Sequence, residues 1–253
     1  MIAANAERAP ELADSAPLDV VEDLVREPTR LVDGMIGESA AARARTLLAT
    51  VAIGGGIFGA VVGAHRGGAQ IAIAALKIPA ILLVTLVVCV PAFLGLARGL
   101  GLSTSTSEVI ATTLAACARM ALVLAGLAPV VWLFEGWASY HGAVIVVAAA
   151  TGAAGLAGAS LLLRSFARRG RFGAIAGVAM LLVYGLVGAQ SAWLLRPFLV
   201  HPSTTRVPLL QPLEGDLFAA LRASLRSASG SYDDDDGAWL GRRTPRRAPG
   251  SPR

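Results

Sequence analysis

Residues 71–97 read IAIAALKIPAILLVTLVVCVPAFLGLA and contain a single charged side chain, Lys77, the only lysine in the chain. A helix needs about 20 apolar residues to cross the hydrocarbon core of a bilayer, which is roughly 30 Å thick. This stretch meets that length and predicts a transmembrane helix. The fold then depends on how many such stretches the chain contains.

Four further apolar stretches of similar length lie on either side of it, at Thr46 to Ala64, Val109 to Phe134, Gly142 to Leu163 and Phe172 to Leu194. Nothing after Leu195 is long enough for another, because the best later run, Val207 to Leu213, is short and carries two prolines. The sequence therefore predicts an all-α fold, a polytopic transmembrane bundle of about five spans with a disordered C-terminal tail.

The composition agrees with a membrane protein. Hydrophobic residues make up 55% and charged residues 15% of the chain, which is too little polar material to coat a soluble globule. The formal net charge of +5 does not indicate nucleic acid, because the basic residues of the apolar region gather near the ends of the spans. We expect the lipid bilayer, and no nucleic acid, among the partners.

The chain divides into four predicted regions. They are an acidic cytoplasmic arm at 1–45, a five-span domain at 46–195, a proline-rich strip with a short amphipathic helix at 196–226, and a disordered tail at 227–253. Within the arm, residues 18–32 have helix-like apolar spacing interrupted by Pro28. This segment fits a short helix on the membrane or on a partner, but a loosely ordered arm is the favoured interpretation.

Positive charge near the span ends predicts the orientation, since cytoplasmic loops retain Lys and Arg during insertion. With the N-terminus inside, the inner flanks hold seven arginines, namely Arg43, Arg45, Arg98, Arg164, Arg168, Arg169 and Arg171. The outer flanks hold three, Arg66, Arg196 and Arg206. We expect a multi-pass protein of the cell membrane with a cytoplasmic N-terminus and an external C-terminus.

Small residues recur at helical spacing and predict close helix packing. They are Gly55, Gly59 and Gly63 in the first span and Gly173 and Gly177 in the fifth. In lipid, small residues let two helix backbones approach so that dispersion contacts accumulate. Packing within one molecule is the favoured interpretation, and a homodimer through the first span is the alternative.

Two basic residues, Lys77 and Arg119, fall inside predicted spans and are the candidate ligand-binding residues. Counted at about 1.5 Å per residue, they lie at similar depth, where together they would suit a lipid phosphate or a carboxylate. The alternative is a shifted span boundary. Each side chain would then be an ordinary anchor that reaches the headgroups.

The sequence contains no complete catalytic, nucleotide-binding or metal-binding motif. The histidines at 65, 141 and 201 all fall just outside predicted span ends, without the carboxylates that usually support a zinc site. Cys89 and Cys117 lie within spans and fit small apolar core residues. We expect no enzymatic activity, no cofactor and no metal.

The segment Ala75-Leu76-Lys77-Ile78-Pro79 and the strip from Trp193 to Phe198 resemble recurring features of bacterial membrane proteins of unknown function. The acidic arm, the five closely spaced spans, the short loops and the far-side C-terminus resemble the Yip1-type family over about residues 46–226. This resemblance transfers no catalytic residue. It implies a protein that organises or recruits partners at a membrane. A transporter or a lipid- or anion-handling component that uses Lys77 and Arg119 is the alternative.

Overall fold

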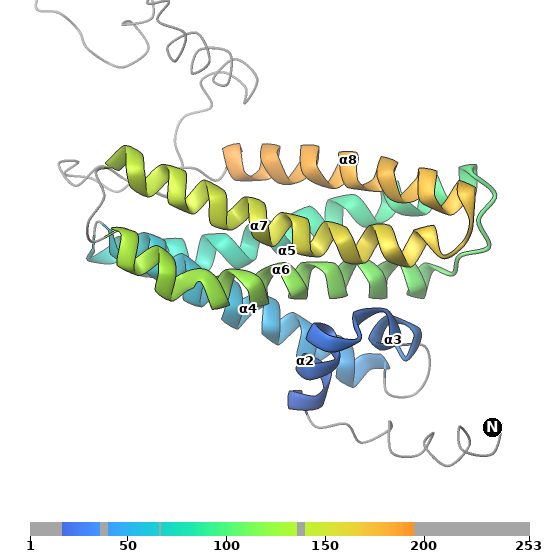
Figure 1. The fold of residues 1–253 in the computed structure, drawn as a ribbon, viewed down its shortest axis with the longest axis horizontal. Helices are drawn as coiled ribbons and strands as arrows, with labels where there is room; N and C mark the ends of the chain where they lie inside the picture. Colours follow the sequence, from blue (N-terminus) through green and yellow to red (C-terminus); the bar gives the residue numbers. More distant parts are fainter. Residues whose placement is uncertain (1–16, 36–39, 66, 136–139, 195–253) are drawn as a thin grey trace, which may run out of the picture. The chain divides into compact units, whose positions relative to one another are not determined.

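The computed structural model describes residues 17–35, 40–65, 67–135 and 140–194. All regular structure in these ranges is helical (Figure 1): α2 (Pro17–Arg26), α3 (Pro28–Asp33), α4 (Ala40–Ala64), α5 (Ala69–Gly99), α6 (Thr106–Glu135), α7 (Tyr140–Ala167) and α8 (Arg171–Leu194). Five of them, α4 to α8, are long and apolar enough to cross a membrane. The predicted all-α bundle with five spans is confirmed, and the protein is a polytopic membrane protein.

The helices extend beyond the predicted spans. The longest, α5, has 31 residues, which correspond to about 46 Å of helix against roughly 30 Å of hydrocarbon. It runs without a break through Pro79 and Pro91, and α6 continues through Pro129 in the same way. The predicted proline strip, the second amphipathic helix and the tail, at 196–253, lie outside the described residues.

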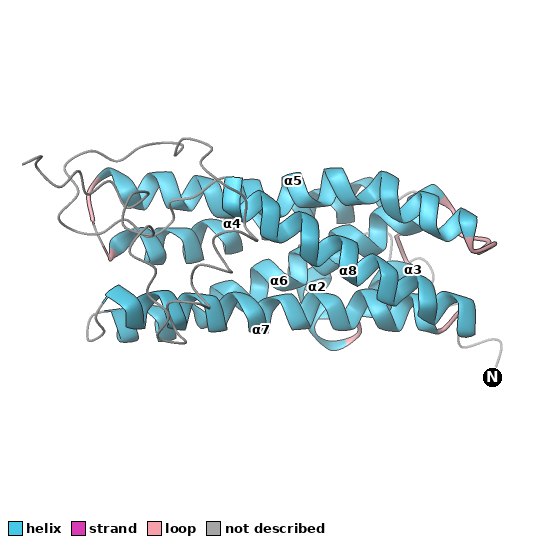
Figure 2. Cartoon of the chain, turned by 90° about the horizontal axis from the view of Figure 1, so that it is seen from above, coloured by secondary structure: helices cyan, strands magenta, loops and turns pink. Residues whose placement is uncertain are grey.

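The five long helices lie side by side in one bundle (Figure 2), in which helices consecutive in sequence run in opposite directions. Following the contacts around the bundle, α4 packs on α5, α5 on α8, α8 on α7, α7 on α6, and α6 on α4. The helices α5 and α6 also meet across this ring. Large apolar side chains, including Phe58, Phe93, Phe166, Leu161 and Met180, are fully buried in the core.

The glycines of α4 lie against α5. A Cβ added to Gly55 would lie 3.2 Å from Cα of Pro79, and one on Gly63 would lie 2.5 Å from the carbonyl oxygen of Gln70. A Cβ on Gly59 would meet the carbonyl oxygen of Ala74 even more closely. Since α5 occupies this glycine face within the same chain, a homodimer through the face would require α5 to move away.

The other glycines at close helix contacts lie against α7 or α6. Gly173 lies against the carbonyl oxygen of Phe166, and a Cβ on Gly177 would lie 3.1 Å from Cδ1 of Leu163, so both face α7. Gly54, which the spacing does not single out, lies against α6, where an added Cβ would be 2.7 Å from the carbonyl oxygen of Ala121. Close packing therefore involves two faces of α4.

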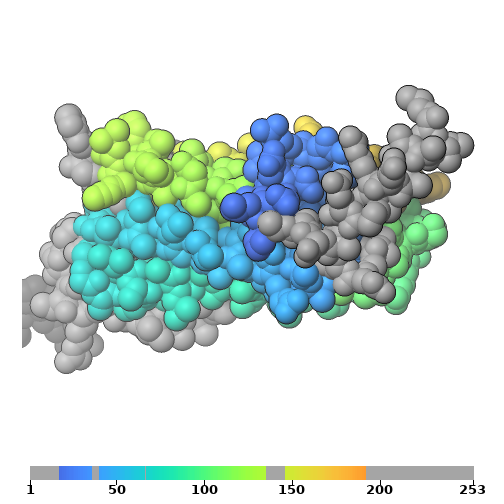
Figure 3. Space-filling view, turned by 90° about the horizontal axis from the view of Figure 1, so that it is seen from below, coloured from blue at the N-terminus to red at the C-terminus, as the bar shows by residue number. Residues whose placement is uncertain are grey.

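Residues 17–35 form a platform that packs on the bundle. Its two helices, α2 and α3, contact α4, α6 and α7, and they do so through buried apolar side chains: Val20, Leu24, Leu31, Val32 and Met35. Figure 3 shows these helices, in dark blue, lying across α4 near one end of the bundle. The expectation of a loosely ordered arm is wrong for these residues, because their apolar face is covered by the protein's own spans.

Candidate functional site

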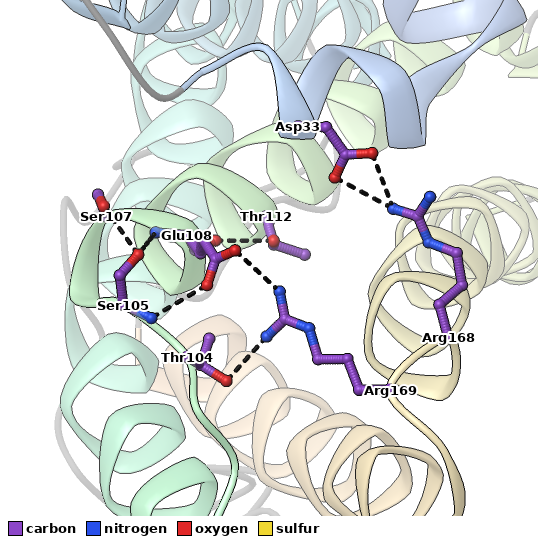
Figure 4. A network of polar contacts seen from close by, with 8 residues as sticks. All are labelled: Asp33, Thr104, Ser105, Ser107, Glu108, Thr112, Arg168 and Arg169. Carbon is purple, nitrogen blue, oxygen red and sulfur yellow. Dashed lines mark hydrogen bonds and ion pairs between the residues drawn. The ribbon is translucent and has the colours of Figure 1, made fainter.

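Salt bridges and hydrogen bonds join the platform and the loops at one end of the bundle, which we call the platform end (Figure 4). At this end α4, α6 and α8 begin, while α5 and α7 finish. Arg168, just after α7, lies 3.3 Å from both carboxylate oxygens of Asp33 in α3. Both side chains are largely exposed, so this pair adds little stability but defines where α3 sits.

Glu108 both caps α6 and forms a salt bridge in this network. Its Oε2 accepts a hydrogen bond of 3.0 Å from the backbone N–H of Ser105, and its own N–H donates to Ser105 Oγ at 3.2 Å. This reciprocal pair is a capping box, and the Ser-x-x-Glu spacing at 105–108 is its sequence signal. The other carboxylate oxygen lies 3.2 Å from Arg169, which also donates to Thr104 at 2.8 Å. The start of α6 is thereby tied to the turn after α7.

Arg43 links α4 to the end of α3. Its side chain is 5% exposed, and its Nη1 donates a hydrogen bond to the carbonyl oxygen of Gly34, which follows α3. The last carbonyls of a helix lack partners within the helix, so a guanidinium at that position stabilises the terminus. In the sequence, Arg43 stands out only as a topology signal, because nothing local indicates that Gly34 folds back beside it.

Lys77 lies inside the bundle. It is the ninth residue of α5, its side chain is 7% exposed, and its Nζ is buried without a hydrogen-bond partner among the described residues. An anchor that reaches the headgroups would keep its ammonium group outside the protein. The burial of Nζ does not fit that alternative.

Arg119 lies at nearly the same depth as Lys77 but faces another direction. Cys117 lies 3.8 Å from the carbonyl oxygen of Leu82, which aligns α6 with α5. Measured from this contact along their helices, Lys77 lies about 7 Å and Arg119 about 3 Å further from the platform end. Residues two apart on a helix point about 200° apart, so Arg119 faces away from α5. The structure does not bring the two candidate residues together.

Arg119 instead lies near Arg164 of α7. Nη1 of Arg119 is buried without a hydrogen-bond partner among the described residues. Within the described ranges, no carboxylate lies within ion-pair distance of either arginine. Sequence spacing could not reveal this pair, because it depends on how α7 docks against α6.

A sulfur-containing contact lies in the middle of the bundle. The hydroxyl of Tyr184 in α8 is 3.0 Å from Sγ of Cys117 and 3.4 Å from Sδ of Met120. The hydroxyl of a partly buried tyrosine favours a polar partner, and these two sulfurs provide one. Cys89 and Cys117 are both buried and free of disulfides.

Within the described residues, no group of three His, Cys, Asp or Glu side chains could hold a metal ion. His65 directly follows α4, and His201 lies outside the described residues.

Comparison with known proteins does not place this chain in a family. No family model matches it, no curated protein matches it, and no solved structure matches it. The resemblance to Yip1-type proteins stays a prediction, and a functional proposal has to be argued from the geometry alone.

Proposed function

We propose that this membrane protein recruits or organises partner proteins at one face of a bilayer, using the platform as its docking element, in a role that involves no catalysis. The observation that supports this proposal is the platform itself. It is amphipathic, it is held against three spans, and its polar face is directed outward. The resemblance to Yip1-type proteins implies the same kind of role.

The buried side of the platform explains why it would be a rigid docking element. Leu24 is 0% exposed, and Val20, Leu31 and Val32 are almost as deeply buried. The hydrogen bond from Arg43 to Gly34 ties the end of α3 to α4, and Asp33 of α3 pairs with Arg168 at the turn after α7. A partner that binds a surface ordered in advance loses less conformational entropy than one that must order the surface itself.

The outward side determines what would bind. The exposed face of α2 carries Glu22 between two exposed apolar residues, Leu18 and Val25. Glu22 pairs with Arg26 at the surface, and the platform as a whole has five acids against two arginines. An acidic surface with apolar side chains is complementary to a basic amphipathic segment. It would be repelled by anionic lipid, so a protein partner fits it better than the membrane surface does.

Site-specific crosslinking in cells tests the recruiting role. A photoreactive amino acid at Leu18, which is 79% exposed, should produce a discrete protein adduct, and Glu22→Lys should abolish it by reversing the adjacent charge. The matched control is the same amino acid at Leu182, an exposed position on the surface of α8. An adduct that persists in Glu22→Lys, or no adduct at Leu18, would contradict the proposal.

The environment of Lys77 favours a second candidate function, in which the bundle holds an anionic group. A buried ammonium without a partner is unfavourable in a medium of low polarity, and an anion would relieve that cost. Uncompensated charges within membrane spans commonly mark the paths or sites of ligands.

Acetate provides a simple carboxylate probe for this second function. The purified full-length protein should gain thermal stability with added acetate, and Lys77→Gln should abolish the gain while Lys77→Arg retains part of it. Arg119→Gln should leave the gain unchanged, because that side chain faces away from α5. Equal responses of the wild-type protein and Lys77→Gln would exclude Lys77 as the binding group.

A further inference from the structure

Beside the contact between α6 and α7 lie two positive charges, Arg119 and Arg164, that no acid of the described residues neutralises. Gly158 of α7 lies against Met120 and Ala116 of α6, which aligns the two helices. Arg119 is thus close to the level of this contact, whereas Arg164 is six residues further along α7, roughly 9 Å nearer the platform end.

The two side chains point toward each other along the bundle axis, which reduces the separation between their guanidinium groups. Long side chains on a helix lean toward its N-terminus. Because α6 begins at the platform end and α7 finishes there, Arg119 leans toward the platform end and Arg164 leans away from it. The two guanidinium groups therefore approach each other along the bundle axis.

The carboxylates nearby are already engaged. Glu108 pairs with Arg169 and caps α6, and Asp33 pairs with Arg168. Ser165, which follows Arg164, faces α6 because it is seven residues from Gly158, and its buried Oγ has no partner among the described residues. Two like charges and a free hydroxyl converge where no acid of the described protein reaches.

We propose that Arg119 and Arg164 bind a phosphate group beside the contact between α6 and α7, between the middle of the bundle and the platform end. Guanidinium groups suit phosphate because their planar N–H pairs match its oxygens. A basic pocket between spans near one membrane face is typical of sites for anionic lipid headgroups, and a soluble phosphate ion would offer the same chemistry. This inference is independent of partner recruitment, since neither arginine lies on the exposed face of α2.

Thermal unfolding and native mass spectrometry of the full-length protein in a neutral detergent test the site. Phosphatidylglycerol should raise the melting temperature and remain bound as one molecule per chain, whereas phosphatidylcholine should not. Arg119→Gln and Arg164→Gln should each weaken phosphatidylglycerol binding at least about tenfold, the loss expected for one charge-assisted contact. The matched control is Arg98→Gln, which removes an exposed arginine at the end of α5 and should leave the affinity within about twofold.

Inorganic phosphate separates the two sources of the ligand. Stabilisation by phosphate alone that depends on both arginines would assign a soluble ion, and stabilisation only by phosphatidylglycerol would assign a lipid. If Arg119→Gln does not fold, Arg164→Gln carries the test, because that side chain is exposed and not required for packing. Equal binding of the two lipids together with no response to phosphate, or unchanged binding in Arg164→Gln, would overturn the proposal.

Discussion

At Gly59, the lack of a side chain allows α4 and α5 to touch backbone to backbone. The position faces the peptide between Ala74 and Ala75, and an added Cβ would overlap with backbone atoms, which cannot rotate away as a side chain can. Close approach of this kind replaces the hydrophobic effect as a source of stability between helices in lipid.

Gly59→Leu should therefore destabilise the bundle by on the order of 3 kcal/mol or more, because the leucine would force α4 and α5 apart. Thermal unfolding in a mild detergent would measure the loss. Gly126→Leu is the matched control, since an added Cβ at Gly126 of α6 meets no atom within 4 Å. Equal stability of the two variants would show that the α4–α5 contact does not depend on Gly59.

Single residues were only partly predictable from sequence. The spacing of Gly55, Gly59 and Gly63 is visible in the sequence, but the helix that they contact is not. Lys77 and Arg119 stand out because charges are rare in apolar runs. Their separation follows from the rotation of α6, which the alignment of Cys117 with Leu82 reveals.

At the level of elements, the platform is the feature that differs most from expectation. The spacing of residues 18–32 indicates an apolar face, but it does not indicate whether lipid, a partner or the protein itself covers that face. Pro28 explains the break between α2 and α3, because it lies at the first position of α3, where a missing N–H has no cost. What covers the apolar face depends on contacts far away in sequence.

Leu24→Ala should loosen the platform without disturbing the spans. Removing a fully buried leucine side chain costs about 2–5 kcal/mol, and here that cost falls on the contact between α2 and the bundle. Hydrogen exchange of residues 17–35 should become faster, while exchange within α5 and α6 stays unchanged. Leu18→Ala, at an exposed position of the same helix, should have no such effect. Faster exchange throughout the bundle would instead indicate that the platform and the spans unfold together.

For the whole molecule, the odd number of candidate spans predicts that the two termini lie on opposite sides of the membrane. The excess of arginines at the platform end predicts that this end faces the cytoplasm. Two of these arginines, Arg168 and Arg169, are paired with acids in the fold, but pairing takes place after insertion and does not remove the signal that they provide during it.

Reporter fusions test this orientation. Fusions after Arg45, Arg98 and Arg171 should report the cytoplasm, and fusions after Arg66, His141 and Arg206 should report the outside. A cytoplasmic signal after Arg206 combined with an external signal after Arg45 would reverse the orientation. Signals on the same side at both positions would contradict the five-span arrangement.

The amino-acid sequence by itself determined the number, type and approximate position of the spans. Transfer of an apolar helix into lipid depends on local composition and length, and both can be read directly from the chain. The tertiary structure alone decided which helix faces meet, that the platform packs on α4, α6 and α7, and that Arg119 lies near Arg164 and away from Lys77. These features depend on the rotation and alignment of helices far apart in sequence, which close packing of small side chains sets only when the whole bundle has assembled.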